Sequence, residues 1–373
     1  MTLTSALLLV GGLAVLVGGG EVLVRGAGGV ARVMGMSPLL VGLTVVAFAT
    51  SAPELAVALG ATLGGNPGLA VGNVVGSNIA NGLLVLGLSA AILPVIVGSQ
   101  VIRRDIPVVA VLSAGVLAMS LDLRIGRVEG LLLVAAVAVY VVVTVIEARR
   151  SGADGSASPP PEAAAPPAPA GRAGHLRRDA VLVAAGVGLL VVGADWLVEG
   201  ATQVARSIGV SDLVIGLTVV AVGTSLPELA TSLIAAARGE RDMAVGNVVG
   251  SCVFNLGAVL GLSALAASGG IPIEPAAVRF DLPFMLATAI ALLPVAFTGL
   301  VIARWEGAVF VAYYVAYITF LVLTATEHPA LPAFGWAMRS FVIPLTVLTL
   351  AVLVVQELRL RRDRGAPSGA AAG

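Results

Sequence analysis

The sequence predicts an all-α polytopic membrane protein with two inverted five-helix repeats, ten core transmembrane helices in all, and an extra C-terminal transmembrane helix. Three observations lead there: hydrophobic residues fill 58% of the 373 positions, charged residues only 11%, and one motif occurs twice within apolar sequence. A soluble core of this size could not bury so many apolar side chains, and the mean hydropathy of +1.04 agrees.

Apolar runs long enough to cross a bilayer, which takes about 20 helical residues, occur eleven times. They lie near 5–33, 38–61, 68–92, 105–121, 128–147, 180–205, 213–237, 243–268, 281–300, 305–325 and 336–357. The runs are too long and too uniformly apolar for the short alternating segments of a transmembrane β-barrel. We therefore expect helices throughout.

The repeat is visible as two blocks at one offset. Segment 42–54 reads Gly-Leu-Thr-Val-Val-Ala-Phe-Ala-Thr-Ser-Ala-Pro-Glu and returns nearly unchanged 174 residues later, at 216–228. The block Val-Gly-Asn-Val-Val-Gly-Ser at 71–77 returns at the same offset. Because each copy contains five crossings, an odd number, the second copy enters the membrane from the opposite side.

The chain accordingly divides into four segments. They are a first repeat at 1–150 with its α-repeat at 38–92, a linker at 151–178, a second repeat at 179–326 with its α-repeat at 212–268, and the eleventh helix with an arginine-rich tail at 327–373. The linker is rich in alanine and proline and has no apolar periodicity, so we expect it to be disordered.

The distribution of arginine predicts the orientation. With the N-terminus outside and the linker and C-terminus in the cytoplasm, 16 of the 21 basic residues, all arginines, fall inside and 5 outside. The outside set is Arg124, Arg127, Arg206, Arg279 and Arg339. We expect a multi-pass protein of a prokaryotic plasma (inner) membrane, surrounded by lipid; the oligomeric state stays open, with a monomer among the options.

Several function classes are excluded. The formal net charge is zero, which gives no indication of nucleic-acid binding. Cys252 is the single cysteine, and both histidines, His175 and His328, lie in predicted loops. No phosphate-binding loop is present, and Ser51 and Ser225 lack a histidine partner. We expect neither an enzyme nor a resident cofactor.

The two glutamates that end the repeated motif, Glu54 and Glu228, lie in mid-membrane sequence. An ionisable residue there is expensive and indicates a functional site. The preceding proline removes a backbone donor and leaves carbonyl oxygens without helical partners. Two neighbouring carboxylates would repel one another or take up protons unless a cation neutralises them. Oxygen ligands suit a hard ion, so the residues predict a site for Ca²⁺, Na⁺ or both.

The second block adds polar groups at helical spacing. Ser77 and Asn81 are four residues apart, as are Ser251 and Asn255, so each pair shares one helix face, which we expect to look toward the glutamates. The glycines at 72, 76, 246 and 250 fit close helix packing instead.

At these residues the sequence resembles the calcium/cation antiporter superfamily, specifically the prokaryotic sodium/calcium exchangers, whose paired α-repeats carry Gly-Thr-Ser-x-Pro-Glu and Gly-Asn-x-x-Gly-Ser-x-x-x-Asn/Asp. The resemblance covers about residues 5–325. It implies that the second, third, seventh and eighth helices line the ion sites. It also implies that the first and sixth helices slide as a gate, which glycines such as Gly18 to Gly20, Gly186 and Gly188 would permit.

The resemblance also implies ligands. Ca²⁺ would be held by the carboxylates of Glu54 and Glu228 and the carbonyls of Thr50 and Thr224. The residues implied for Na⁺ are Ala47, Thr50, Ser51 and Ser77 in one repeat and Ala221, Thr224, Ser225 and Ser251 in the other, with Asn81 and Asn255 at the centre. Both ions are transported substrates rather than cofactors.

Two positions depart from the family pattern. Ala49 replaces the usual glycine, and Asn255 stands where many relatives have aspartate, which leaves two carboxylates rather than three. The expected function is Ca²⁺/Na⁺ antiport by alternating access. Ca²⁺/H⁺ antiport, with the glutamates carrying protons, and a passive cation channel are the alternatives.

Overall fold

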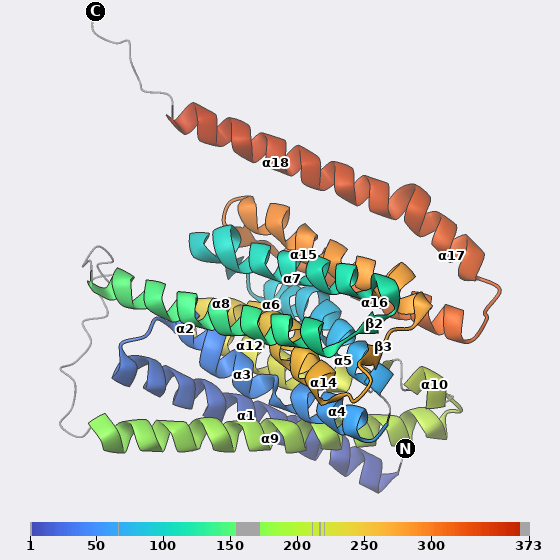
Figure 1. Ribbon diagram of the computed structural model, residues 1–373, viewed down its shortest axis with the longest axis horizontal. Helices are drawn as coiled ribbons and strands as arrows, with labels where there is room; N and C mark the ends of the chain where they lie inside the picture. Colours follow the sequence, from blue (N-terminus) through green and yellow to red (C-terminus); the bar gives the residue numbers. More distant parts are fainter. Residues whose placement is uncertain are drawn as a thin grey trace, which may run out of the picture.

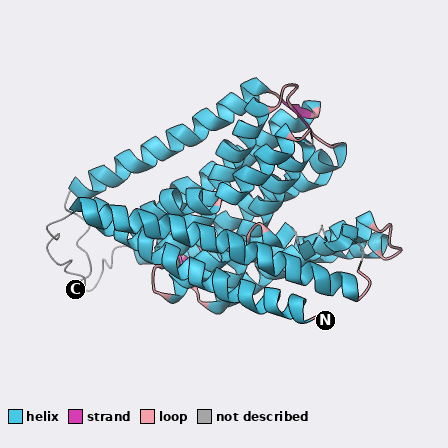
Figure 2. Cartoon of the chain, turned by 90° about the horizontal axis from the view of Figure 1, so that it is seen from below, coloured by secondary structure: helices cyan, strands magenta, loops and turns pink. Residues whose placement is uncertain are grey.

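The computed structural model describes residues 2–65, 67–153, 172–210, 212–215, 218–219 and 221–365. Within them the chain is almost entirely helical, and short strands occur only in connecting segments (Figure 2). Ten helices in the described part are long and apolar enough to cross a membrane. They correspond to ten of the eleven predicted runs, and the other, near 213–237, is described only in pieces. The all-α polytopic prediction is confirmed.

The elements follow in order along the chain. The first half contains α1 (Leu3–Met34), α2 (Pro38–Val41), η1 (Gly42–Val46), α3 (Ala47–Thr50), α4 (Ala52–Leu63), α5 (Pro67–Ile79), η2 (Ala80–Val85), α6 (Leu86–Ile92), β1 (Val95–Ile96), η3 (Val101–Asp105), α7 (Ile106–Met119), η4 (Ser120–Asp122), β2 (Arg124–Ile125) and α8 (Arg127–Ala153). The second half contains α9 (Arg172–Ser207), α10 (Asp212–Ile215), α11 (Ala221–Gly223), α12 (Leu226–Ala237), α13 (Arg241–Phe254), η6 (Asn255–Val259), α14 (Leu260–Ala266), β3 (Ile271–Pro272), η7 (Ala277–Asp281), α15 (Leu282–Phe297), β4 (Val301–Ile302), α16 (Arg304–Ala325), α17 (Leu331–Ala337), η8 (Met338–Val342) and α18 (Ile343–Gly365).

The transmembrane helices contain π-helical turns that the sequence reading did not predict. The turn η2 follows α5, and η6 follows α13 at the equivalent place in the second repeat. A π-turn shifts the hydrogen-bond register by one residue and often marks a functional site. Asn81 and Asn255 lie in these two turns, so the local widening falls on the predicted centre of the ion site.

The long helices α1 and α9 pack against each other along a row of glycines (Figure 1). Glycines recur every seven residues on both helices, and each meets the backbone of the other. The row consists of Gly12, Gly19 and Gly26 on α1 and Gly186, Gly193 and Gly200 on α9. A methyl group on Gly19 would lie 2.7 Å from the Leu190 nitrogen, and one on Gly193 would lie 2.5 Å from the Leu16 nitrogen. The contacts descend α9 as they ascend α1, so these equivalent helices run antiparallel.

The glycines of the second block behave differently in the two repeats. Gly246 and Gly250 press against the segment α2–η1–α3, where hypothetical methyl groups would come within 2.7–2.8 Å of Leu39, Leu43 or Ala47 atoms. A methyl group on Gly72 or Gly76, by contrast, would meet no atom within 4 Å among the described residues. The expectation of close packing was therefore wrong for Gly72 and Gly76, because equivalent helix faces in the two repeats do not have equivalent neighbours.

Two small antiparallel strand pairs join connecting segments across the repeats. β1 pairs with β4, matching Val95 with Ile302, and β2 pairs with β3, matching Ile125 with Ile271. In the topology drawn from the arginines, β1 and β4 lie on the cytoplasmic side, and β2 and β3 on the other. Each pair therefore joins loops that this topology places on the same side.

Two boundaries differ from the sequence reading. The helix α8 continues to Ala153 and α9 begins at Arg172, so both ends of the predicted linker 151–178 are helical. The rest of that linker, 154–171, lies outside the described residues. At the other end of the chain, α18 is the outermost helix (Figure 1), and it contacts the bundle through α15 and α16, where Tyr313 Oη lies 2.6 Å from Thr346 Oγ1. None of the most apolar stretch of 331–359 is buried.

Candidate ion-binding site

The two motif glutamates occupy equivalent helix starts. Glu54 lies in the first turn of α4 and Glu228 in the first turn of α12, and both are fully buried. The preceding residue is a proline at the start of each helix, where its missing N–H leaves no intrahelical bond unmade. The break lies just before, at Ser51, which follows the end of α3, and at Thr224 and Ser225, which follow the end of α11. The repeated Thr-Ser-x-Pro-Glu motif thus produces a broken helix whose new N-terminus carries the carboxylate.

These carboxylates lie near one another. Glu228 is close enough for its charge to act on Glu54. The packing explains this proximity, because each broken helix contacts the opposite repeat: α4 packs on η6 and α12 on η2. The two half-sites therefore meet where the repeats meet.

The two carboxylates belong to a set of buried oxygen and nitrogen atoms that have no hydrogen-bond partner among the described groups. The set comprises both carboxylate oxygens of Glu54 and Glu228, the hydroxyls of Ser51, Ser77, Ser225 and Thr231, and the carboxamide atoms of Asn81 and Asn255. A buried polar atom without a partner is unfavourable by about 1–3 kcal/mol, and more when charged. The concentration of these atoms in the repeated motifs is characteristic of a site built for a polar or charged guest rather than for packing.

Thr50 connects the two repeats. Its hydroxyl lies 3.1 Å from Asn247 Oδ1 and 3.3 Å from Ser251 Oγ, both on α13 of the second repeat. Asn247 and Ser251 are four residues apart on one face of that helix. The close approach of α13 to α3 follows from the packing of Gly246 and Gly250.

Asn73 and Asn247 were missed as site residues. Asn73 Nδ2 donates to the Glu54 carbonyl at 3.1 Å, and Asn247 Nδ2 donates to the Glu228 carbonyl at 3.4 Å. Both belong to the repeated Gly-Asn-Val-Val-Gly-Ser block, so their equivalent occurrence was the available signal. Their contacts place them beside the glutamate turns.

The other predicted residues have these positions. The Ala47 side chain is fully buried, and its carbonyl accepts the Ser51 N–H at 3.0 Å. Thr224 is half-buried beside the turn at Ser225, and Ala221 begins α11, where only its backbone is described.

The donor set determines which ions the site can bind. Carboxylates, hydroxyls, carboxamides and carbonyls are hard ligands that fit Ca²⁺ or Na⁺. Within the described ranges no group of three or more His, Cys, Asp or Glu side chains comes together. Two carboxylates would balance one divalent ion.

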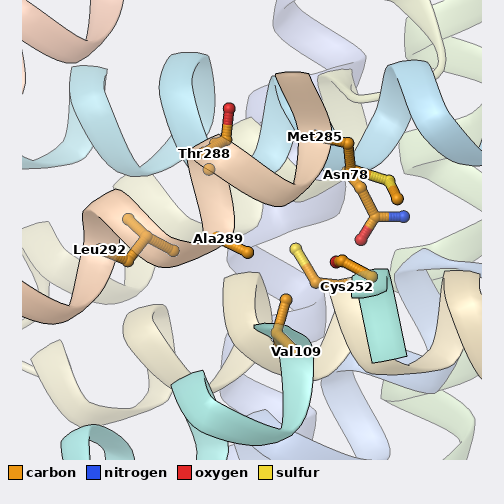
Figure 3. Close-up of a pocket in the computed structure, with 9 residues that line it drawn as sticks. Asn78, Val109, Cys252, Met285, Thr288, Ala289 and Leu292 are labelled. Carbon is orange, nitrogen blue, oxygen red and sulfur yellow. The ribbon is translucent and has the colours of Figure 1, made fainter. Parts of the chain in front are cut away.

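A separate small cavity is lined by Asn78 and Cys252, the residues that follow Ser77 and Ser251 in the sequence. Val109 also lines it, together with Met285, Thr288, Ala289 and Leu292 of α15 (Figure 3). The cavity is large enough for about one water molecule. No carboxylate lines it. The glutamates, not this cavity, define the candidate ion site.

The fold and site have clear relatives. The chain matches the family described as "Sodium/calcium exchanger protein" over residues 4–146 and 179–323. It is 38% identical over 296 residues to "Inner membrane protein YrbG" of Escherichia coli, covering 78% of this chain and 87% of the relative. It is 30% identical over 343 residues to "Sodium/calcium exchanger MaX1" of Methanosarcina acetivorans, covering 84% and 97%.

A solved structure agrees with these relatives. The sodium-calcium exchanger NCX_Mj, soaked with Na⁺ and Sr²⁺, superimposes with a TM-score of 0.71 at 31% sequence identity, covering 86% of this chain and 99% of that one. The chain therefore belongs to the sodium/calcium exchanger family of membrane cation antiporters.

Proposed function

We propose that the protein exchanges Ca²⁺ for Na⁺ across a prokaryotic plasma (inner) membrane by alternating access. One observation carries the proposal: Glu54 and Glu228 are fully buried close together, and neither carboxylate has a hydrogen-bond partner among the described groups. Two such charges in a medium of low dielectric constant require neutralisation. One Ca²⁺ supplies two positive charges, and so do two Na⁺.

In this proposal the glutamate carboxylates and the carbonyls of Thr50 and Thr224 hold Ca²⁺. The hydroxyls of Ser51, Ser77, Ser225 and Ser251, together with Thr50, Ala47 and their repeat equivalents, hold Na⁺, and Asn81 and Asn255 lie between the half-sites. The unpartnered atoms at Ser51, Ser77, Ser225, Asn81 and Asn255 support this assignment.

Alternating access requires the two repeats to take unequal positions. Gly72 is exposed and Asn73 half-buried, whereas their equivalents Gly246 and Asn247 are buried against the other repeat. In the proposed orientation the start of α13 lies toward the cytoplasm and the start of α5 toward the outside. The structure then corresponds to a state closed on the cytoplasmic side, and an exchange of roles between the repeats would open it.

The proposed orientation keeps the N-terminus outside and the α8 end, the α9 start and the C-terminus in the cytoplasm. The strand pairs β1–β4 and β2–β3 agree with the grouping of the loops, because each joins loops assigned to one side, and the arginine distribution determines which side is the cytoplasm. A name such as "Inner membrane protein" for the Escherichia coli relative agrees with a plasma-membrane location.

The driving force favours three sodium ions for each calcium ion. With a tenfold Na⁺ gradient and about 100 mV, electroneutral exchange of two Na⁺ supports a calcium gradient of only about 10²-fold. Three Na⁺ move one net charge, which adds about 2.3 kcal/mol and brings the total to about 6.4 kcal/mol, or nearly 10⁵-fold.

Imposing the gradients separately tests the proposal. Proteoliposomes loaded with Na⁺ and diluted into Na⁺-free buffer should take up ⁴⁵Ca²⁺, and a pH gradient alone should not drive uptake. Uptake driven by the pH gradient alone would instead support Ca²⁺/H⁺ antiport. Uptake that requires no counter-ion would indicate a passive channel.

A further inference from the structure

We propose that Asn247 is a positioning residue that orients the Thr50 hydroxyl as an acceptor toward the transported ion. The inference rests on the proposed function of the glutamate site, and it concerns a residue that does not itself contribute an ion ligand. Asn247 is fully buried at the contact between the two repeats. Its carboxamide contacts Thr50 in one repeat and the Glu228 turn in the other.

The neighbours of Asn247 determine which way its carboxamide points. The Glu228 carbonyl can only accept a hydrogen bond, and it lies 3.4 Å from Asn247 Nδ2. Ser232 Oγ lies 3.0 Å from the same nitrogen. A flipped amide would place its oxygen against the carbonyl oxygen, so this orientation is the one that the network supports.

The orientation of the amide in turn determines the proton of Thr50. Asn247 Oδ1 is acceptor only, so at 3.1 Å the Thr50 hydroxyl must be the donor. A hydroxyl has one proton and two acceptor lone pairs. Once the proton is directed at Asn247, the lone pairs remain for a cation.

The alternative acceptor shows why this matters. The Thr50 hydroxyl also lies 3.4 Å from the carbonyl of Ala47, which can only accept a hydrogen bond. Without Asn247, the hydroxyl would direct its proton at that carbonyl and occupy an oxygen that the proposed Na⁺ site needs. A monovalent ion competes with such a hydrogen bond less strongly than a divalent ion, so Na⁺ binding should weaken more than Ca²⁺ binding.

The equivalent asparagine provides a matched control. Asn73 donates to the Glu54 carbonyl at 3.1 Å, within its own repeat, and is half-buried. The position equivalent to Ser232 is Ala58, which has no hydroxyl. The cross-repeat network built on Asn247 and Ser232 is thus specific to the second repeat.

The test is a double-mutant cycle measured by binding. Equilibrium ⁴⁵Ca²⁺ binding to the detergent-purified full chain, displaced by Na⁺, gives a calcium affinity and a sodium competition constant without relying on transport. Asn247→Leu should raise the Na⁺ concentration needed for half-displacement about tenfold, the equivalent of one buried hydrogen bond. Its effect on Ca²⁺ affinity should be smaller, and Asn73→Leu should shift the sodium constant by less than about twofold.

Thr50→Val removes the hydroxyl while keeping the shape, so in that background Asn247→Leu should produce no further change in the sodium constant. If Asn247→Leu does not fold, Ser232→Ala, which removes one bond to the amide, should give a shift of about two- to threefold that Thr50→Val likewise abolishes. Additive effects, or equal weakening of Na⁺ and Ca²⁺, would overturn the inference. Proteoliposome flux of the wild type tests the proposed exchange separately.

Discussion

Arg238, at the end of α12, forms an ion pair with Glu21 in the middle of α1. The Arg238 Nε lies 2.7 Å from Glu21 Oε2, and a second guanidinium nitrogen contacts Glu21 Oε1. In the other repeat, Asp195 is the equivalent of Glu21 and Gly64 is the equivalent of Arg238. The first repeat therefore has no basic side chain at the position that matches Arg238. The ion pair connects α1, the candidate gate helix, to α12, which carries Glu228, and the first repeat has no equivalent ion pair.

Arg238→Gln should loosen this attachment and favour opening on the cytoplasmic side. Each side chain of the pair is 33% exposed, so its contribution is small, about 1 kcal/mol, or about a fivefold shift between two states. Hydrogen–deuterium exchange should show faster exchange of the last turn of α12. Arg241→Gln, which removes the same charge three residues later, is the control, and equal exchange in both variants would contradict this role.

The glycine row between α1 and α9 predicts position-specific instability. Gly19→Ala and Gly193→Ala place a methyl group 2.7 Å and 2.5 Å from a backbone nitrogen of the partner helix. Such overpacking should destabilise the fold by about 1–3 kcal/mol, despite the better helix propensity of alanine. Thermal unfolding in detergent should show a lower melting temperature.

The control substitutions for this row are Gly18→Ala and Gly188→Ala, whose new methyl groups meet no atom within 4 Å among the described residues. They should leave the melting temperature unchanged or raise it slightly. Identical behaviour of both pairs would show that α1 and α9 do not pack through this row.

Much of this organisation could be predicted from the sequence, and the exceptions have a common cause. The repeated Thr-Ser-x-Pro-Glu motif located Glu54 and Glu228, because an acid in an apolar run is rarely structural. Residue spacing also located most of the transmembrane helices. The same spacing could not separate Gly72 from Gly246, or Asn73 from Asn247, since equivalent sequence acquires different neighbours once the repeats pack unequally.

The helix geometry contains a second exception. The turns η2 and η6 change the hydrogen-bond register around Asn81 and Asn255 without changing the apolar pattern. Hydrophobic periodicity reports which face is buried and is insensitive to one inserted residue in a buried helix. Likewise, of the glycines expected to serve the gate, Gly19, Gly20 and Gly186 lie in close contacts, whereas a methyl group on Gly18 or Gly188 would meet no atom within 4 Å among the described residues.

Asn255→Asp should change ion coupling more than folding. Asn255 is fully buried, and both polar atoms of its carboxamide lack partners among the described groups. A third carboxylate near Glu54 and Glu228 adds like-charge repulsion, which a further cation or proton would relieve. Initial Ca²⁺ flux of the variant at fixed Na⁺ should therefore depend on pH and K⁺ more than that of the wild type. Identical profiles would show that Asn255 does not face the transported ions.

The charge of the two glutamates is the most direct test of the account. Glu54→Gln and Glu228→Gln keep the side-chain size and remove one of the two negative charges that face the ion. The control is Glu199→Gln, an exposed acid on α9, which should exchange normally. Na⁺-driven ⁴⁵Ca²⁺ uptake into proteoliposomes, at matched protein incorporation, should be abolished in both site variants to a comparable extent. Near-normal uptake by either one would contradict the assignment of the ion site.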